Sequence, residues 1–205
     1  MKRIVYFEDL SVKQVYSILT QSIIPRPIAW VVTVSQEGLG NLAPFSYFNA
    51  VSSKPPIIMI SITWSERKGV KDTLRNIKEI KEFTVNIPSG DQFEAVVQTA
   101  GEYDFGINEA ELCGVELVKS MKVQPMLVKD CKINFECVLE KVVQFGDESV
   151  GSVQVVFGKI LVAHIDESCI VENRIDPVKL NPLARLGLNQ YALLGDILTR
   201  DIPRV

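Results

Sequence analysis

The sequence has little of what a metal site or a disulfide framework needs. It contains a single histidine, His164, and four cysteines in 205 residues. The cysteines are Cys113, Cys131, Cys137 and Cys169, and no two of them form a C-x-x-C pair. With one histidine to join them, no set of metal ligands is recognisable. We therefore expect reduced, buried thiols and no metal site.

Long apolar runs and an excess of positive charge are also missing. No stretch approaches the roughly 20 apolar residues of a membrane span, and the N-terminal segment turns acidic at Glu8 and Asp9 before a signal-peptide apolar region could form. The 22 Lys and Arg against 25 Asp and Glu give a net charge of −3, which offers no general attraction to nucleic acid or an anionic membrane. We expect a cytoplasmic protein in which any bound anion is held locally.

Apolar, β-branched runs dominate what the chain does contain. Hydrophobic residues make up 47% of the 205, enough for one well-cored domain over residues 1–205. The runs predict strands at 27–34, 42–51, 57–63, 82–87, 133–145 and 152–165. The first is continuous enough for a strand buried on both faces, Pro44 makes the second irregular, and the last two form a hairpin around 146–149. A final apolar run covers 191–198.

Helical spacing is brief. Leu74, Ile77 and Ile80 recur three apart and predict a helix over 72–80 with Asp72 as its N-cap, and 92–100 predicts a second short helix. Strands thus outnumber helices without a regular βαβ alternation. This balance predicts a mainly β protein, an antiparallel sheet closed or nearly closed into a barrel.

A glycine pattern at 38–43, Gly-Leu-Gly-Asn-Leu-Ala, matches a dinucleotide-binding fingerprint. That fingerprint needs a helix to open at the glycines so that N–H groups can hold a pyrophosphate. Here Pro44 and β-rich residues follow instead. We interpret residues 36–41 as a hairpin turn.

The stretch 41–53 mixes aromatic residues with short polar side chains, among them Ser46, Asn49, Ser52 and Ser53. Such a mixture suits a flat heterocycle, because apolar groups cover its face and short polar groups satisfy its edge. The simpler alternative is a strand with one solvated face.

Three cations, Arg67, Lys68 and Lys71, directly precede the predicted helix. A phosphate there would meet these charges, the Thr73 hydroxyl and the helix N-terminus. Alone, the cations would be ordinary solvated surface. The heterocycle and anion stretches flank one predicted strand, 57–63, as a mononucleotide site requires.

These motifs together resemble the flavin reductase-like FMN-binding family, which includes flavoredoxins and nitrilotriacetate monooxygenase component B. The resemblance rests on Pro-Arg-Pro-Ile-Ala-Trp-Val-Val-Thr at 25–33, Asn-Leu-Ala-Pro-Phe-Ser-Tyr-Phe-Asn at 41–49 and Lys-Asp-Thr at 71–73. It continues through 83–87, 134–137 and 183–187. Leu188 stands where the family commonly has a second glycine.

The resemblance implies a fold, a cofactor and contacts. The fold is a split β-barrel of antiparallel Greek-key type, forming a homodimer with FMN near the subunit interface. The implied flavin contacts are Ser46, Phe48, Asn49 and Ser52 at the ring or ribityl chain, Ser61 beside it, Lys71 and Thr73 at the phosphate with Arg67 or Lys68, and Arg26, Arg185 and Tyr191. His164, at the end of the predicted strand 152–165, is by itself most simply a rim residue; the resemblance makes it a weak catalytic candidate near the nicotinamide or flavin.

The leading hypothesis is an NAD(P)H:flavin oxidoreductase with FMN, NADH or NADPH as transient donor, and a separate monooxygenase as an implied partner. One alternative is a flavoredoxin-like electron carrier that keeps its FMN. The other is a flavin-binding or structural barrel without turnover. The residues that would bind the ring are the same in the first two cases.

Overall fold

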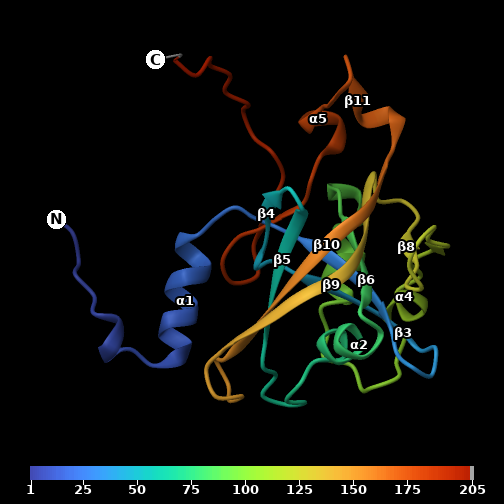
Figure 1. Ribbon diagram of the computed structural model, residues 1–205. Helices are drawn as coiled ribbons and strands as arrows, with labels where there is room; N and C mark the ends of the chain where they lie inside the picture. Colours follow the sequence, from blue (N-terminus) through green and yellow to red (C-terminus); the bar gives the residue numbers. More distant parts are fainter. Residues whose placement is uncertain (204–205) are drawn as a thin grey trace.

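The computed structural model describes residues 1–203 and shows an antiparallel seven-stranded sheet in the order β3-β2-β6-β9-β10-β5-β4 (Figure 1). Its strands are β2 (Ala29–Val34), β3 (Gly40–Phe45), β4 (Phe48–Ser53), β5 (Pro56–Thr63), β6 (Glu82–Ile87), β9 (Ile133–Phe145) and β10 (Val153–Ile165). The two outermost strands of this order, β3 and β4, are joined through Ser46 and Tyr47 alone. Ser61 N–H of β5 donates to the Tyr47 carbonyl at 2.8 Å. The sheet therefore curls back on itself, and the predicted antiparallel barrel is confirmed.

Strand β2 separates two apolar cores. Ala29 and Val31 pack inside the barrel with residues of β5, β6 and α2. Trp30 and Val32, which point the other way, pack with Leu42 in a second cluster. Both faces of β2 are buried, which explains its continuous apolar sequence and confirms that prediction.

Shorter elements surround the sheet. The helices are α1 (Val12–Ser22), α2 (Asp72–Ile80), α3 (Phe93–Gln98), α4 (Glu109–Leu112) and α5 (Pro177–Leu180), with 3-10 turns η1 (Phe7–Asp9), η2 (Gly90–Gln92) and η3 (Glu167–Cys169). A separate sheet joins β1 (Arg26–Pro27), β13 (Ala184–Arg185) and β14 (Tyr191–Ala192). The remaining pairs are β7 (Leu117–Val118) with β8 (Leu127–Val128) and β11 (Ile170–Val171) with β12 (Arg174–Ile175). None of the helices in residues 1–203 is long and apolar enough to span a bilayer.

Helix α2 has the predicted bounds but a different N-cap. Lys71 occupies the capping position, and its side chain makes no capping hydrogen bond. Asp72 is the first helical residue, and its Oδ2 lies 2.6 Å from Lys68 Nζ. The prediction of Asp72 as N-cap was wrong, because this carboxylate pairs with a cation instead of a backbone N–H.

Other boundaries also differ from the predictions. The run 42–51 is divided between β3 and β4 by the turn at Ser46 and Tyr47, the helix expected over 92–100 is only Phe93–Gln98, and the run 191–198 contributes only Tyr191–Ala192 to a strand. The hairpin of β9 and β10 is as predicted, and the turn expected at 36–41 is present but ends at residue 39, because Gly40 and Asn41 already belong to β3. Gly38 there has φ of +83°, which favours glycine, and a strand rather than a helix follows, so the dinucleotide fingerprint is excluded.

Helix α1 was missed, although its start carries a recognisable signal. Ser11 and Gln14 form a capping box, in which Ser11 N–H donates to Gln14 Oε1 at 2.9 Å. In Figure 1, α1 and the segment before it stand away from the barrel, as does the C-terminal segment. Large apolar side chains are exposed along both terminal segments, including Ile4, Tyr6, Phe7, Leu194, Ile197, Leu198 and Ile202.

Gly158, where the β9–β10 pairing shifts register, allows the close approach of a core ring. A Cβ added there would lie 2.3 Å from Phe83 Cζ, whereas one added at Gly195 meets nothing within 4 Å. We expect Gly158→Ala to lower the free energy of unfolding by about 1–3 kcal/mol through overpacking, and Gly195→Ala to change it little. Urea denaturation measures both; equal midpoints for the two variants would contradict this account of the core.

Candidate functional site

Two pockets meet at the end of β3. The first, here called the anion pocket, has the polar lining residues Asn41, Ser65, Lys68, Lys71, Asp72, Thr73, Thr99, Glu102, Tyr103 and Glu109. The second, here called the tyrosine pocket, is lined by Tyr16, Arg26, Ile28, Ser46, Val96, Arg185 and Tyr191. Pro44 and Ala100 line both pockets. A ligand with an anionic end and a planar end could therefore occupy the two together.

Lys71 and Thr73 give the anion pocket its binding groups. Lys68 is already paired with Asp72, whereas Lys71 forms no ion pair within residues 1–203. The buried Thr73 Oγ1 accepts a hydrogen bond from Asn41 Nδ2 at 3.0 Å, which leaves its O–H free to donate. Lys71 and the Thr73 hydroxyl are thus available to an anion.

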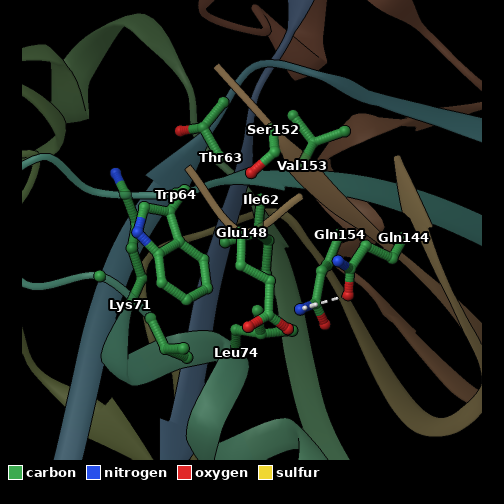
Figure 2. A pocket seen from close by; sticks show the side chains of 12 residues that line it. Ile62, Thr63, Trp64, Lys71, Leu74, Gln144, Glu148, Ser152, Val153 and Gln154 are labelled. Atoms are coloured by element: carbon green, nitrogen blue, oxygen red, sulfur yellow. Dashed lines mark hydrogen bonds between the residues drawn. The ribbon is translucent and has the colours of Figure 1, made fainter. Parts of the chain in front are cut away.

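Lys71 also borders a neighbouring pocket, shown in Figure 2, where it lies beside Trp64. Leu74 and Glu148 face this space, and Gln154 donates to Gln144 at 3.4 Å at its edge. Lys71 is the one cation among its lining residues, and Glu148 opposes it. This pocket is therefore less suited to an anion than the one containing Thr73.

Arg67 is directed away from the anion pocket. Its guanidinium donates to the Glu102 carbonyl and to Asp104 Oδ1, each at 2.5 Å. Ser65 Oγ donates to Glu102 Oε1 at 3.1 Å. Arg67 and Ser65 thus tie the segment before α2 to the segment that follows α3. The predicted contact of Arg67 with a phosphate would require it to leave Asp104.

Arg26 lines the tyrosine pocket, but its N–H groups donate to acceptors of the protein itself. Its Nη1 donates to the carbonyls of Thr20 and Ile23, the latter at 3.0 Å, and its Nη2 donates to the Leu186 carbonyl at 2.8 Å. Its Nε points to Ser46 Oγ at 3.4 Å. Burial lowers the pKa of Arg26 below its usual value, partly offset by Tyr47. Arg26 therefore shapes the pocket by fixing its walls.

Arg185 and Tyr191 form the opposite wall. The Arg185 guanidinium carbon lies 4.3 Å from the Tyr191 ring centroid, and Phe93 packs edge-on against that ring at 5.1 Å between centroids. Arg185 also donates to the Leu188 carbonyl. Leu188 has φ of +54°, in the left-handed region that favours glycine, which accounts for the glycine common at this position in the resembling family.

The residues predicted from β4 and β5 lie outside both pockets, although Ser46 lines the tyrosine pocket. Phe48 packs on the barrel core. Asn49 Oδ1 accepts from Ala50 N–H at 2.8 Å and Ser52 Oγ accepts from Lys54 N–H at 3.2 Å, both on the exposed edge strand. Ser61 lies on β5, the next strand. Flavin contacts from these four residues stay a prediction.

His164 lies in a different part of the protein. Its Nε2 is 2.6 Å from Oε1 of the fully buried Glu136, which also accepts hydrogen bonds from the N–H groups of Met121, Lys122 and Val123. Burial would raise the pKa of Glu136, but these donors together with His164 lower it below its usual value. His164 and Glu136 line neither pocket and anchor a surface loop.

Several lining residues were absent from the predicted site, among them Tyr16, Asn41 and Glu109. Tyr16 comes from α1, which was not predicted. Asn41 has a weak sequence signal, as an amide inside an apolar run, and Glu109 has none. The latter reaches the pocket from α4, in a segment that carried no periodic pattern.

Comparison with known proteins identifies the family. Residues 21–173 match the family model described as a flavin reductase like domain. The chain belongs to the flavin reductase-like family. Flavin binding and the split β-barrel are thereby supported at the level of the family and its fold.

Similar solved structures support the assignment to this family and its fold. The chain is 33% identical to nitrilotriacetate monooxygenase component B from Bacillus cereus, with a TM-score of 0.92 over 98% of this chain and 99% of the other. It is 32% identical to 2-nitrobenzoate 2-nitroreductase from Pseudomonas fluorescens, with a TM-score of 0.87 over 98% and 96%. A split-barrel protein from Shewanella frigidimarina is 20% identical with a TM-score of 0.81 over 97% and 96%, which supports the fold alone.

The Glu136 cluster generates a stability prediction. We expect Glu136→Gln to lower the free energy of unfolding by about 2–4 kcal/mol near pH 7, because buried charge-assisted hydrogen bonds are lost. Since the pKa of Glu136 is lowered in the folded state, its contribution is present above the unfolded pKa of about 4.3 and is lost as pH falls through the folded pKa.

Urea unfolding of wild type and variant from pH 7 to pH 3 measures this difference. The exposed Glu140 on the same strand provides the matched control, Glu140→Gln, which should differ little from wild type at any pH. A gap between wild type and Glu136→Gln that stays constant down to pH 3 would show that the carboxylate charge is not its source.

Proposed function

We propose that this protein is an FMN-dependent oxidoreductase that takes electrons from NADH or NADPH. The observation that carries the proposal is the junction of the anion pocket and the tyrosine pocket at Pro44 and Ala100, in a chain of the flavin reductase-like family. A mononucleotide has the same two ends, a phosphate and a planar ring, at fixed separation.

The donor set of the anion pocket fits a phosphate. Lys71 supplies an ammonium group that forms no ion pair within residues 1–203, and Thr73, oriented by Asn41, supplies a hydroxyl donor. Both residues stand at the start of α2, where backbone N–H groups and the helix dipole favour an anion. These groups would hold the FMN phosphate without help from Lys68, which is bound to Asp72.

The tyrosine pocket fits a planar ring. Tyr191, held edge-on by Phe93, offers an aromatic surface, and Ser46 offers a short polar group. Arg185 would favour negative charge on a bound ring from its place beside Tyr191. Bound FMN would supply the redox chemistry, namely uptake of a hydride from the nicotinamide and release of electrons to an acceptor. The protein's own task is to hold the two rings at contact distance.

A homodimer is part of the proposal. Edge strand β4 has mostly exposed side chains, and both terminal segments expose large apolar residues such as Tyr6 and Leu198. An open strand edge and exposed apolar surface both favour association with a second copy. Such a partner would cover β4, where Asn49 and Ser52 lie, and so could bring these residues to the flavin.

Two similar proteins suggest candidates for the electron acceptor. Similarity to nitrilotriacetate monooxygenase component B favours transfer of electrons to a monooxygenase partner. Similarity to 2-nitrobenzoate 2-nitroreductase favours a second candidate, an aromatic acid whose carboxylate could pair with Arg185. Retention of FMN through gel filtration with slow NAD(P)H oxidation would instead favour an electron carrier.

The redox assignment has a direct test. Protein reconstituted with FMN should lose the absorbance of the oxidised flavin, at ~450 nm, on anaerobic addition of NADH or NADPH. Titration with each nicotinamide separately gives the preferred donor. A flavin that stays oxidised with both would rule out the reductase and leave the carrier or a binding protein without turnover.

Lys71 has a test of its own. We expect Lys71→Gln to weaken FMN binding by about 10- to 100-fold, because one charge-assisted hydrogen bond to the phosphate is lost, and to leave riboflavin binding unchanged. Lys78→Gln, an exposed substitution in the last turn of the same helix, is the control. Flavin fluorescence titration measures each affinity; equal losses for FMN and riboflavin would place the phosphate elsewhere.

A further inference from the structure

Glu109 is a buried carboxyl group in the anion pocket that the proposed function leaves without a role. It is 6% exposed and begins α4. Its Oε2 accepts a hydrogen bond from Leu42 N–H at 2.8 Å, one residue along β3 from the Asn41 that orients Thr73. Its Oε1 makes no hydrogen bond within residues 1–203. One carboxyl oxygen is therefore anchored and the other is available to the pocket.

The charges of the pocket do not favour a second anion beside an ionised Glu109. Two lysines and three carboxylates line it, and one of the lysines, Lys68, is committed to Asp72. A phosphate would bring up to two negative charges. Like charges in a partly desolvated site raise each other's pKa until one of them takes up a proton.

The groups around Glu109 determine which carboxyl group takes up the proton. They are Lys68, Lys71 and Asp72 at the start of α2, Glu102 after α3, Cys113 at the end of α4 and the Leu42 N–H of β3. Burial already raises the pKa of Glu109, and Asp72 adds to this, while Leu42 N–H, the backbone N–H of Glu109 itself and Lys68 oppose it. Asp72 pairs with Lys68, and Glu102 accepts a hydrogen bond from the Ser65 hydroxyl. Glu109 is therefore the carboxyl group that loses its charge most easily.

We propose that Glu109 binds the phosphate of the ligand as a neutral carboxylic acid, donating O–H from Oε1 to a phosphate oxygen while Oε2 keeps the Leu42 N–H. The inference rests on the proposed binding of FMN. Where Glu109 is ionised in the free protein, binding takes one proton from solvent. The affinity for FMN then falls as pH rises above the pKa of Glu109 in the free protein, by up to about tenfold per pH unit.

Calorimetric titration of flavin-free protein with FMN, in buffers of different ionisation enthalpy between pH 6 and 9, measures the proton uptake. We expect up to one proton per FMN within this range and none with riboflavin, which lacks the phosphate. Glu109→Gln keeps a hydrogen-bond donor and should bind FMN without proton uptake and without the fall in affinity. Glu111→Gln, on the exposed side of the same short helix, is the matched control and should behave as wild type.

Each outcome decides between alternatives. Uptake that persists in Glu109→Gln places the proton on the phosphate or another group and overturns the proposal. Equal uptake with FMN and riboflavin, or no uptake by wild type at any pH, also overturns it, and neither comparison needs a variant that folds. Absence of FMN binding altogether would refute the proposed function itself, whereas binding without uptake refutes only the role of Glu109.

Discussion

The buried guanidinium of Arg26 holds together the parts of the chain that form the tyrosine pocket. Within residues 1–203 it has no carboxylate partner, and it donates to the carbonyls of Thr20, Ile23 and Leu186. A buried charge is costly unless its donors are used, so these carbonyls must stay in place around it. Helix α1, the β13–β14 turn and the Ser46 corner are thereby fixed relative to one another.

The apolar cores around the barrel and the two pockets lie in different parts of the fold. Strand β2 buries both its faces, one in the barrel interior and one against the cluster that contains Trp30 and Leu42. The pockets lie beyond this double core, where β3 ends and segments from other parts of the chain approach. Strand β3 positions Asn41, and the surrounding elements supply the other groups, namely Ser46 from the turn after β3, Lys71 from the start of α2, Glu109 from α4 and Arg185 from β13.

The features that could be predicted from the sequence are those that depend on interactions between residues close together in the chain. The strands with continuous apolar runs, and α2 with its three-residue spacing, depend on local pattern and were predicted. The grouping of Lys71 and Thr73 in one pocket depends on local pattern too, because the cations and the helix start are neighbours in sequence, while their contact with a phosphate stays a prediction. Helix α1 had a capping box at its start, and only attention to that short signal could have found it.

The rest of the site depends on contacts between distant segments. Arg26 and Arg185 are register partners in a pair of two-residue strands, which is too short to leave a periodic pattern. Glu109 reaches β3 from 67 positions away in the chain. The assignment of Asp72 as N-cap failed for a local reason, since Lys68, four residues earlier, offers its carboxylate a charged partner.

These contacts change the view of the phosphate site obtained from sequence. Three neighbouring cations indicated a strongly basic site, but Arg67 is bound to Asp104 and Lys68 to Asp72, which leaves Lys71. In a chain of net charge −3, the single pocket ammonium that forms no ion pair within residues 1–203 could not by itself balance a phosphate dianion. In the proposed complex the remaining stabilisation would come from neutral donors, namely the Thr73 hydroxyl and the N–H groups at the start of α2. A carboxyl group buried among them would contribute to that binding only in its protonated form, which would couple affinity at this site to pH as well as to charge.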